Sequence, residues 1–224
     1  MKAGTQKMLD DIEAEVRYTR SMIGRDTLSP RVMAAMAEVP RHEFVPADEQ
    51  LYAYANGPLP IGHGQTISQP YIVALMTDLL ECGPEARVLE VGTGSGYQAA
   101  VLSRVVARVY SVEIIAELAR QASERLARSG YDNVQCRHCD GYEGWPEEAP
   151  FDGILVTAAA PAVPTPLIDQ LGEGARLVIP VGPRYGHQEL MVIEKRPDGS
   201  LVTTDILGVA FVPLTRARPG SGDT

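Results

Sequence analysis

Apolar residues gather in short runs over the second half of the chain, and amphipathic segments separate several of these runs. The runs have the length and composition of buried strands and cover residues 88–92, 109–113, 151–157 and 175–181, and we expect a further strand at 134–139. Helical spacing of apolar residues covers 96–107, 115–128 and 164–171. Because strands that alternate with helices form parallel sheets, we predict an α/β fold with a doubly wound, mostly parallel sheet and helices on both faces.

The C-terminal part of the pattern predicts strands without helices between them. Residues 191–195 and 201–202 flank a Pro-Asp-Gly turn and predict a hairpin, and residues 209–214 predict a last strand. Residues 216–224 are mostly small or polar, so we expect a flexible tail there.

The N-terminal part predicts a helical extension followed by an irregular loop. Helical spacing covers residues 5–22, and a second helix begins at Pro30, where Ser29 has the side chain of an N-cap. Residues 47–70 have neither helical nor strand periodicity, and they mix glycines, hydroxyls and amides with apolar side chains. A loop of this length inside a compact domain is usually functional, so we predict a binding role for it. A helix at residues 71–80 follows.

A glycine-rich turn joins the strand predicted at 88–92 to the helix after it. Residues 88–97 read Val-Leu-Glu-Val-Gly-Thr-Gly-Ser-Gly-Tyr. Strand, glycine turn and helix open a nucleotide-binding unit, in which glycine lets the backbone approach a ligand closely. The third glycine comes one position earlier than in the dinucleotide pattern, and no lysine follows as in a P-loop. We therefore predict a Rossmann-like fold that binds a different nucleoside.

Acidic residues end the neighbouring strands of the same predicted sheet. Glu113 lies 21 residues after the first of these glycines, where such units place a carboxylate that binds ribose hydroxyls. Asp140, which precedes Gly141, offers a carboxylate to an adenine amine, or forms a turn. Ligands of open α/β sheets bind at the carboxyl ends of the strands, where Glu90 and Thr157 also lie. A ribose without a pyrophosphate fits this pattern, and S-adenosylmethionine is the predicted ligand.

Composition narrows the classes of partner. The net charge is −9, which opposes nonspecific nucleic-acid binding because that binding requires lysine and arginine. No apolar run approaches the roughly 18 residues of a membrane span, and the N-terminus lacks the apolar core of a signal peptide. We therefore expect a cytoplasmic protein with no nucleic-acid or membrane partner.

The three cysteines do not suggest a disulfide framework, because their number is small and odd. Cys136 and Cys139 form a single C-x-x-C pair, whereas a zinc site needs four ligands and Cys82 is isolated. We expect reduced thiols packed near a strand and no metal site.

Several motifs occur along the chain in an order that is typical of one enzyme family. They are Gly-His-Gly-Gln-Thr-Ile-Ser-Gln-Pro at 62–70, the glycine turn extended to Gln98, Asp-Gly-Tyr-Glu-Gly-Trp at 140–145, Phe-Asp-Gly-Ile at 151–154, Val-Ile-Pro-Val-Gly at 178–182 and Phe-Val-Pro-Leu at 211–214. Over about residues 5–215 the chain resembles the protein-L-isoaspartate O-methyltransferase family of class I S-adenosylmethionine-dependent methyltransferases. The glycine turn is shared by the whole class, whereas the 62–70 motif is far more specific.

The resemblance implies a protein repair enzyme. Such an enzyme transfers a methyl group from S-adenosylmethionine to the free carboxylate of L-isoaspartyl residues, and less well D-aspartyl residues, and releases S-adenosylhomocysteine. The ester then converts through a succinimide, in part to aspartate. The implied partners are isoaspartyl-containing proteins and peptides, and we expect a monomer. Residues 1–215 would form one methyltransferase domain, with N-terminal helices and substrate loop at 1–80, a Rossmann-like core at 85–215 and an altered order of the last strands.

The resemblance also implies roles for individual residues. Ser68 corresponds to the active-site residue of the family, and Glu113 to the residue that holds the ribose hydroxyls. Asp140 and Gly141 correspond to residues that border the adenine. Cofactor contacts around the glycine turn are expected at Glu90, Gly92, Thr93, Gly94, Ser95 and Gly96. The chain departs from the family at Cys139, where glycine is frequent, and at Ile114, where a basic residue is common.

The implied chemistry needs no general base, because the attacking carboxylate is already ionised at neutral pH. The protein has to align the reactants and exclude water. We expect the Ser68 hydroxyl to orient the substrate carboxylate, while Thr66, Ile67 and Gln69 shape the pocket. Two alternatives stay open: Ser68 as an N-cap of the next helix, and His63 as a base rather than a structural or gating residue.

Other functions also remain open on the residues alone. They are a methyltransferase for a small molecule, a dehydrogenase, and a noncatalytic binding module that kept the fold. The early third glycine opposes the dehydrogenase. Methyl transfer to an isoaspartyl peptide, compared with its aspartyl twin, separates the repair enzyme from the rest.

Overall fold

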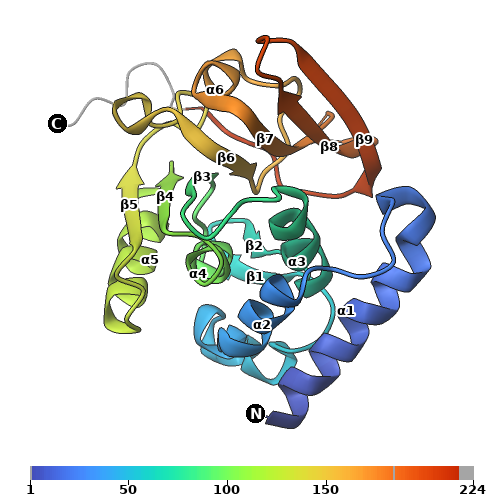
Figure 1. Cartoon of the computed structure of the whole chain (residues 1–224). Coiled ribbons are helices and arrows are strands. Elements are labelled where there is room, and N and C mark those ends of the chain that lie inside the picture. The colour runs from blue at the N-terminus through green and yellow to red at the C-terminus, as the bar shows by residue number, and fades with distance from the viewer. Residues whose placement is uncertain (1, 184, 217–224) are drawn as a thin grey trace, which may run out of the picture.

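A mixed β-sheet forms the centre of the molecule (Figure 1). The structure is a computed structural model that describes residues 2–183 and 185–216. Within them the sheet has the order β5-β4-β3-β6-β7-β8-β9, with β3 (Arg87–Val91), β4 (Arg108–Glu113), β5 (Val134–His138), β6 (Phe151–Val156), β7 (Leu171–Val181), β8 (Gln188–Lys195) and β9 (Leu201–Val209). The strands from β5 to β7 are parallel, and β8 and β9 are added antiparallel in sequence order. This is the doubly wound α/β sheet that the hydrophobic pattern predicts.

Helices cover the two faces of the sheet unequally. The helices are α1 (Lys2–Ile23), α2 (Pro30–Glu38), α3 (Pro70–Leu79), α4 (Tyr97–Ser103), α5 (Ala116–Arg128) and α6 (Thr165–Asp169). Val88 and Leu155 point into one core with α1 to α4, while Leu89 and Ile154 point into a second core closed by α6 and Trp145. Figure 1 shows α3, α4 and α5 together on one side of the sheet. None of the described helices has both the length and the apolar character that crossing a membrane requires.

The N-terminal helices form as predicted, but the 47–70 loop contains more structure than its pattern indicates. Ser29 caps α2, because its hydroxyl accepts a hydrogen bond from the Val32 amide at 3.3 Å. The 3-10 helix η1 (Arg41–Phe44) precedes the loop. The loop itself contains a second 3-10 helix, η2 (Ala47–Tyr52), and a hairpin of β1 (Leu59–Gly62) and β2 (Gln65–Ile67). The prediction of a wholly irregular loop is therefore wrong. The hairpin strands have only four and three residues, too few to show alternation in the sequence.

The C-terminal strand boundaries also differ from the prediction. β7 begins at Leu171 rather than at residue 175, and β9 continues to Val209. The strand predicted at 209–214 is wrong. Residues 210–216, here named the C-terminal segment, contact the end of the sheet through Ala159, whose amide donates to the Val212 carbonyl at 2.8 Å. The apolar side chains of this segment therefore serve a different purpose from those of a sheet strand.

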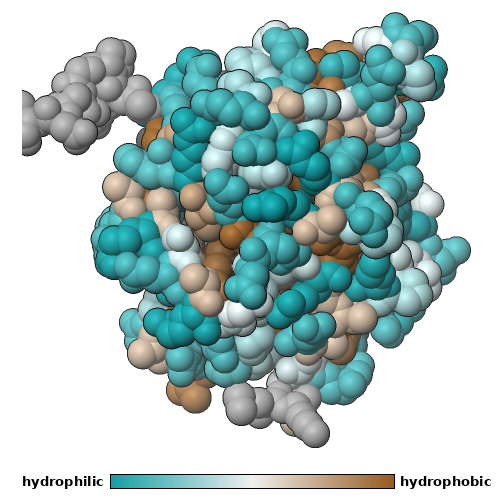
Figure 2. Space-filling view, turned by 60° about the vertical axis from the view of Figure 1, so that its left-hand side comes forward, coloured by the Kyte–Doolittle hydropathy of each residue, from teal (hydrophilic) through white to brown (hydrophobic). Residues whose placement is uncertain are grey.

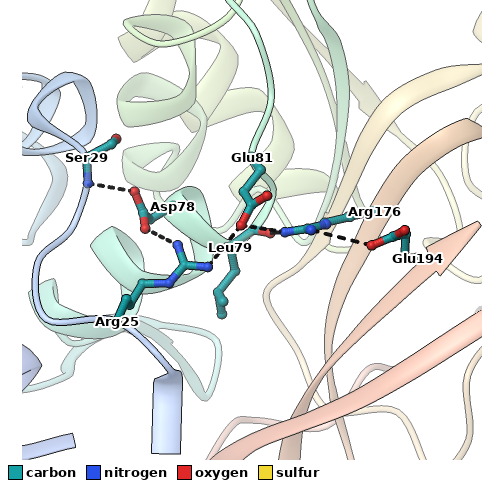
Figure 3. Close-up of polar contacts among 7 residues, drawn as sticks. All are labelled: Arg25, Ser29, Asp78, Leu79, Glu81, Arg176 and Glu194. Carbon is teal, nitrogen blue, oxygen red and sulfur yellow. Dashed lines mark hydrogen bonds and ion pairs between the residues drawn. The ribbon is translucent and has the colours of Figure 1, made fainter. Parts of the chain in front are cut away.

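A charged network anchors the N-terminal helices near the amino ends of the parallel strands (Figure 3). Asp78 of α3 is nearly buried, pairs with Arg25, and accepts a hydrogen bond from the Ser29 amide at 2.8 Å. Glu81 lies between two cations, 3.1 Å from Arg25 and 2.7 Å from Arg176 of β7. Arg176 in turn reaches a glutamate of β8. The network therefore fixes α1 and α2 against the sheet, at the end away from the glycine turn.

Candidate active site

A pocket lies at the carboxyl ends of β3, β4 and β6, where the chain pattern predicts the site. The chain runs from β3 to β4 on one side and returns to β6 on the other, so this is the switch point of the sheet. Among the predicted site residues, those that line the pocket are Thr66, Ile67, Ser68, Gly92, Thr93, Gly94, Ser95, Glu113 and Gly141. The predicted residues outside its lining are Gln69, Glu90, Gly96 and Asp140.

The amide groups of the glycine turn are mostly engaged within the protein. The amides of Gly92 and Thr93 donate to the Val112 carbonyl at 2.8 and 3.2 Å. The Gly96 amide donates to the Thr93 carbonyl at 2.8 Å, and the Gly94 amide donates to a carboxylate of β4. Phosphate binding at a helix N-terminus needs such amides to be free. The turn therefore suits a ligand without phosphate, as its glycine spacing indicates.

Two glycines of the turn are required by close packing as well as by their backbone angles. Gly92 has a φ of +99°, and a Cβ atom there would lie 2.3 Å from Thr157 Oγ1. Gly96 has a φ of +86°, and its Cβ would lie 3.2 Å from Leu126 of α5. Gly92 thus allows the turn to approach the residue that follows β6. Gly96 allows the turn to pack against α5, and Gly96 itself does not line the pocket.

The Glu113 carboxylate at the end of β4 holds the turn and borders the pocket. Its Oε2 accepts the Gly94 amide at 2.8 Å, and its Oε1 accepts the Ile115 amide at 2.9 Å. Each carboxylate oxygen can accept a further hydrogen bond. Glu113 therefore has acceptor capacity for two neighbouring hydroxyls of a ribose.

Glu90 lies beneath the turn, because alternation along β3 points it to the same side as Val88, toward α4. It is fully buried and accepts a hydrogen bond from Ser111, whose Oγ lies 2.6 Å from Thr93 Oγ1. Among the described residues its Oε1 has no partner. Burial raises the pKa of Glu90 to about 8, so the carboxyl is mostly protonated at neutral pH. In this structure Glu90 supports the turn from below.

The segment after β5 forms the far wall. Asp140 Oδ1 accepts a hydrogen bond from the Tyr142 amide at 2.9 Å. This is the turn that the sequence predicts for Asp140 as the alternative to an adenine contact. Gly141 lines the pocket, and a Cβ atom there would lie 2.6 Å from Val91. Gln170 holds the following residues, because its Oε1 accepts the Trp145 amide at 2.7 Å. This wall therefore depends on glycine for space and on a buried amide for its shape.

The segment between β2 and α3 forms the wall that faces the turn. Ile67 is buried, Ser68 is half-buried and Thr66 is exposed. Gln69 occupies the N-cap position of α3, and no side chain caps this helix, so the N-cap role for Ser68 is wrong. Within residues 2–183 and 185–216 the Ser68 hydroxyl has no hydrogen-bond partner. It is therefore available to a ligand in the pocket.

His63 lies outside the pocket lining, at the tip of the β1–β2 hairpin. It is exposed and has a φ of +53° between two glycines. On the same hairpin, Ile61 would lie 3.3 Å from a Cβ atom placed on Gly94, so the hairpin packs over the glycine turn. This placement fits a structural or gating role for His63 and gives no support to a base.

Some lining residues were not assigned a binding role from the sequence. Thr157 donates through Oγ1 to the Gly92 carbonyl at 2.6 Å and to the Val91 carbonyl at 3.1 Å. Its position at a strand end was visible in the sequence, but its contact with Gly92 was not. Residues 212–215 of the C-terminal segment also line the pocket. Their signal was the Phe-Val-Pro-Leu motif, which the prediction of a last strand explained differently.

The thiols and carboxylates give no sign of nucleophilic or metal chemistry. Burial raises the pKa of Cys82 to about 11 and that of Cys136 to about 12, so both stay protonated at neutral pH. Over the part of the chain that the structure describes, no three His, Cys, Asp or Glu side chains are arranged to hold a metal ion. The pocket instead combines hydrogen-bond acceptors, an apolar lining and hydroxyls such as that of Ser68.

Comparison with known proteins gives consistent matches. Residues 20–219 match the family model described as "Protein-L-isoaspartate(D-aspartate) O-methyltransferase (PCMT)". A Syntrophobacter fumaroxidans protein named protein-L-isoaspartate O-methyltransferase 2 is 62% identical, over 95% of this chain and 86% of its own. A Polaromonas protein of the same name is 61% identical, over 94% of this chain and 100% of its own.

Two solved structures share the fold over most of this chain. One, titled protein-L-isoaspartate O-methyltransferase, has a TM-score of 0.82 and 31% identity, over 93% of this chain and 65% of the longer solved one. The other is a Plasmodium falciparum protein whose title describes it as a "putative protein-L-isoaspartate O-methyltransferase". It was solved in complex with S-adenosyl-L-homocysteine. It has a TM-score of 0.75 and 26% identity, over 92% of this chain and 98% of its own.

Proposed function

Because the chain belongs to the protein-L-isoaspartate(D-aspartate) O-methyltransferase family, we propose a role for each wall of its pocket in the reaction of that family. The enzyme transfers a methyl group from S-adenosylmethionine to the free carboxylate of isoaspartyl residues in proteins, a repair reaction. The observation that carries the residue assignment is the shared pocket, in which Glu113 and the glycine turn face the free hydroxyl of Ser68. One wall would hold the methyl donor and the other the damaged protein.

The donor wall fits S-adenosylmethionine on the structure's own contacts. The two Glu113 oxygens have acceptor capacity for ribose hydroxyls, and Gly141, which packs closely on Val91, would border the adenine ring. Gly92 to Ser95 would border the methionine part, with Glu90 and Gly96 supporting them from outside the lining. When bound, S-adenosylmethionine supplies a methyl group on a positively charged sulfur. Asp140 supports the adenine wall through its turn.

The acceptor wall would orient the substrate carboxylate. This carboxylate is ionised at neutral pH, so no residue has to remove a proton from it. The Ser68 hydroxyl would donate a hydrogen bond to one carboxylate oxygen and leave the other free to attack. Thr66 and Ile67 border this position, Gln69 supports it at the start of α3, and the C-terminal segment helps to exclude water.

We also propose the domain organisation, the location and the oligomeric state of the enzyme. One domain over residues 1–215 is supported by the continuous core from α1 to the sheet. A cytoplasmic location is supported by three free cysteines, which suit a reducing compartment. The net charge of −9 opposes nucleic-acid binding. A monomer is supported by the face in Figure 2, which is mostly hydrophilic, with hydrophobic surface in small separate areas.

We expect label transfer from S-adenosylmethionine with a radioactive methyl group to a peptide that contains one isoaspartyl residue, and none to its aspartyl twin. The twin has the same composition, so a difference reports the position of the carboxylate alone. The measurement is base-labile radioactivity in the peptide after short incubation. Binding of S-adenosylhomocysteine with no label in either peptide would contradict the repair function and favour a small-molecule acceptor or a binding module.

Ser68→Ala should lower turnover of the isoaspartyl peptide by about ten- to a hundred-fold, because the carboxylate loses its orienting hydrogen bond. The dissociation constant of S-adenosylhomocysteine should stay unchanged, since Ser68 lies on the acceptor wall. Ser68→Thr, which keeps a hydroxyl, should retain part of the turnover. Steady-state kinetics and calorimetry measure both quantities, and full turnover by Ser68→Ala would exclude the orienting role.

A further inference from the structure

Arg41 is completely buried behind the segment that carries Ser68, and the mechanism above does not use it. Its Nε donates to the Ala53 carbonyl at 2.8 Å. Its Nη2 donates to the Ser68 carbonyl at 2.7 Å and to the Gly57 carbonyl at 3.4 Å. One side chain of η1 therefore joins three segments: the end of η2, the turn before β1 and the chain after β2.

The same guanidinium contacts the donor side of the pocket. Its central carbon lies 4.8 Å from the centre of the Tyr97 ring. Tyr97 is the first residue of α4, directly after the glycine turn, and it lines the pocket. Arg41 therefore lies between the wall that carries Ser68 and the wall that carries the turn, and its position sets the spacing of the two walls.

Packing alone does not explain why this side chain is charged. Arginine stays protonated in proteins, and among the described residues Arg41 has no carboxylate partner and its Nη1 has no hydrogen-bond acceptor. A buried charge without a counter-ion is costly, and apolar side chains often replace buried charges without loss of stability. What an apolar side chain lacks is a planar set of donors that reaches several carbonyls at once.

We propose that Arg41 is a positioning residue for the methyl transfer, which fixes the Ser68 backbone, and with it the Ser68 hydroxyl, against the Tyr97 side of the pocket. The proposal rests on the proposed role of Ser68 in orienting the substrate carboxylate. Arg41 does not line the pocket, so it acts through Ser68 and not on the substrate. Lysine has the same charge but lacks the planar set of N–H donors, so it cannot hydrogen-bond all of these carbonyls at once.

The test is a double-mutant cycle with Arg41→Lys, Ser68→Ala and the combined variant, assayed on the isoaspartyl peptide at saturating S-adenosylmethionine. Arg41→Lys should lower kcat by about ten-fold or more, because a misplaced hydroxyl no longer aligns the carboxylate. In the Ser68→Ala background the same substitution should change kcat by less than about two-fold, since residues that act through one another are not additive. The dissociation constant of S-adenosylhomocysteine should change by less than about three-fold throughout.

A contrasting arginine separates positioning of Ser68 from general damage to the pocket. Arg125 of α5 donates through Nη1 to the Ser95 carbonyl at 2.7 Å, so it supports the glycine turn. Arg125→Lys should raise the dissociation constant of S-adenosylhomocysteine. Any loss of kcat that it causes should multiply with the loss of kcat caused by Ser68→Ala. A multiplied loss for Arg41→Lys and Ser68→Ala, or an unchanged kcat of Arg41→Lys, would overturn the proposal.

Two further results remain distinguishable. If a thermal melt shows that Arg41→Lys is not folded, Arg41→Gln takes its place in the double-mutant cycle. The glutamine amide keeps a hydrogen-bond donor but not the charge. If the unmodified enzyme binds S-adenosylhomocysteine but does not methylate the peptide, the proposed function fails, and the positioning role fails with it.

Discussion

Gly92→Ala should weaken the binding of S-adenosylhomocysteine by at least about a hundred-fold. The new methyl group would lie 2.3 Å from Thr157 Oγ1, and the residue would keep a φ of +99° that side chains rarely adopt. Thr157 Oγ1 cannot simply turn away, because it donates to the carbonyls of Gly92 and Val91. The turn itself must therefore move away from β6. Calorimetric titration measures the loss of affinity.

Two matched variants separate the steric effect from the backbone effect. Gly130→Ala introduces the same kind of strain, at a φ of +74°, but its Cβ meets no atom within 4 Å, so the affinity should be preserved. Thr157→Ala removes the clashing oxygen, and combined with Gly92→Ala it should restore part of the lost affinity. Normal binding by Gly92→Ala, or no recovery in the combined variant, would contradict the close approach of the turn to Thr157.

Glu113→Gln should weaken S-adenosylhomocysteine by about thirty- to a hundred-fold. Both carboxylate oxygens accept backbone amides, at 2.8 Å from Gly94 and 2.9 Å from Ile115. A glutamine has one oxygen, so its NH2 group must face one of these donors, and a hydrogen bond to a charged group is worth about 1.5–3 kcal/mol. The ribose loses an acceptor at the same time. Calorimetry measures the dissociation constant.

The control for Glu113 is a nearby glutamate on the surface. Glu117 lies in the first turn of α5 and pairs with Arg120 at 2.7 Å, with its side chain 43% exposed. Glu117→Gln removes the same charge close by and should change the affinity by less than about two-fold, because exposed ion pairs contribute little. Equal effects of the two substitutions would show that Glu113 acts only through its long-range charge.

The centre of the parallel sheet was predictable because β3, β4 and β6 are largely apolar runs that are almost entirely buried, whereas the edge strand β5 is more polar and more exposed. Val88, Leu89 and Val91 fill two different cores, so β3 shows little polar alternation and is visible as a strand in the sequence. The glycine turn and Glu113 followed from it, because their spacing is fixed by the strand and turn geometry. Strand ends then located the pocket without any side-chain detail.

The hairpin and the C-terminal segment were not predictable in the same way. Their apolar side chains face a pocket or a neighbouring loop, so no regular period marks them. Residues 211–214 look like a strand, yet their amides and carbonyls pair with Ala159, with the Tyr142 hydroxyl and with Gln188. The Gln188 Oε1 accepts the Phe211 amide at 2.6 Å. Such a segment depends on partners far away in the sequence, which a local pattern cannot contain.

Glu90 lies outside the pocket lining because its side chain points toward α4. Its position at the end of a strand predicted a cofactor contact, but a strand alternates its two faces. Glu90 lies within β3, shares the face of Val88 and is covered by α4, whereas Gly92 follows the end of β3 at Val91 and lies in the turn at the pocket. The spacing located the turn correctly and left open which of its neighbours face the ligand.

The C-terminal segment also makes the order of synthesis matter. Residues 212–215 follow every strand of the sheet along the chain, yet they form one wall of the pocket. Because a chain leaves the ribosome from its N-terminus, the glycine turn and Glu113 can fold while this wall does not yet exist. A nascent chain can therefore enclose the methyl donor only after β9 has been made, so an incomplete enzyme has the parts of a donor site without a closed pocket.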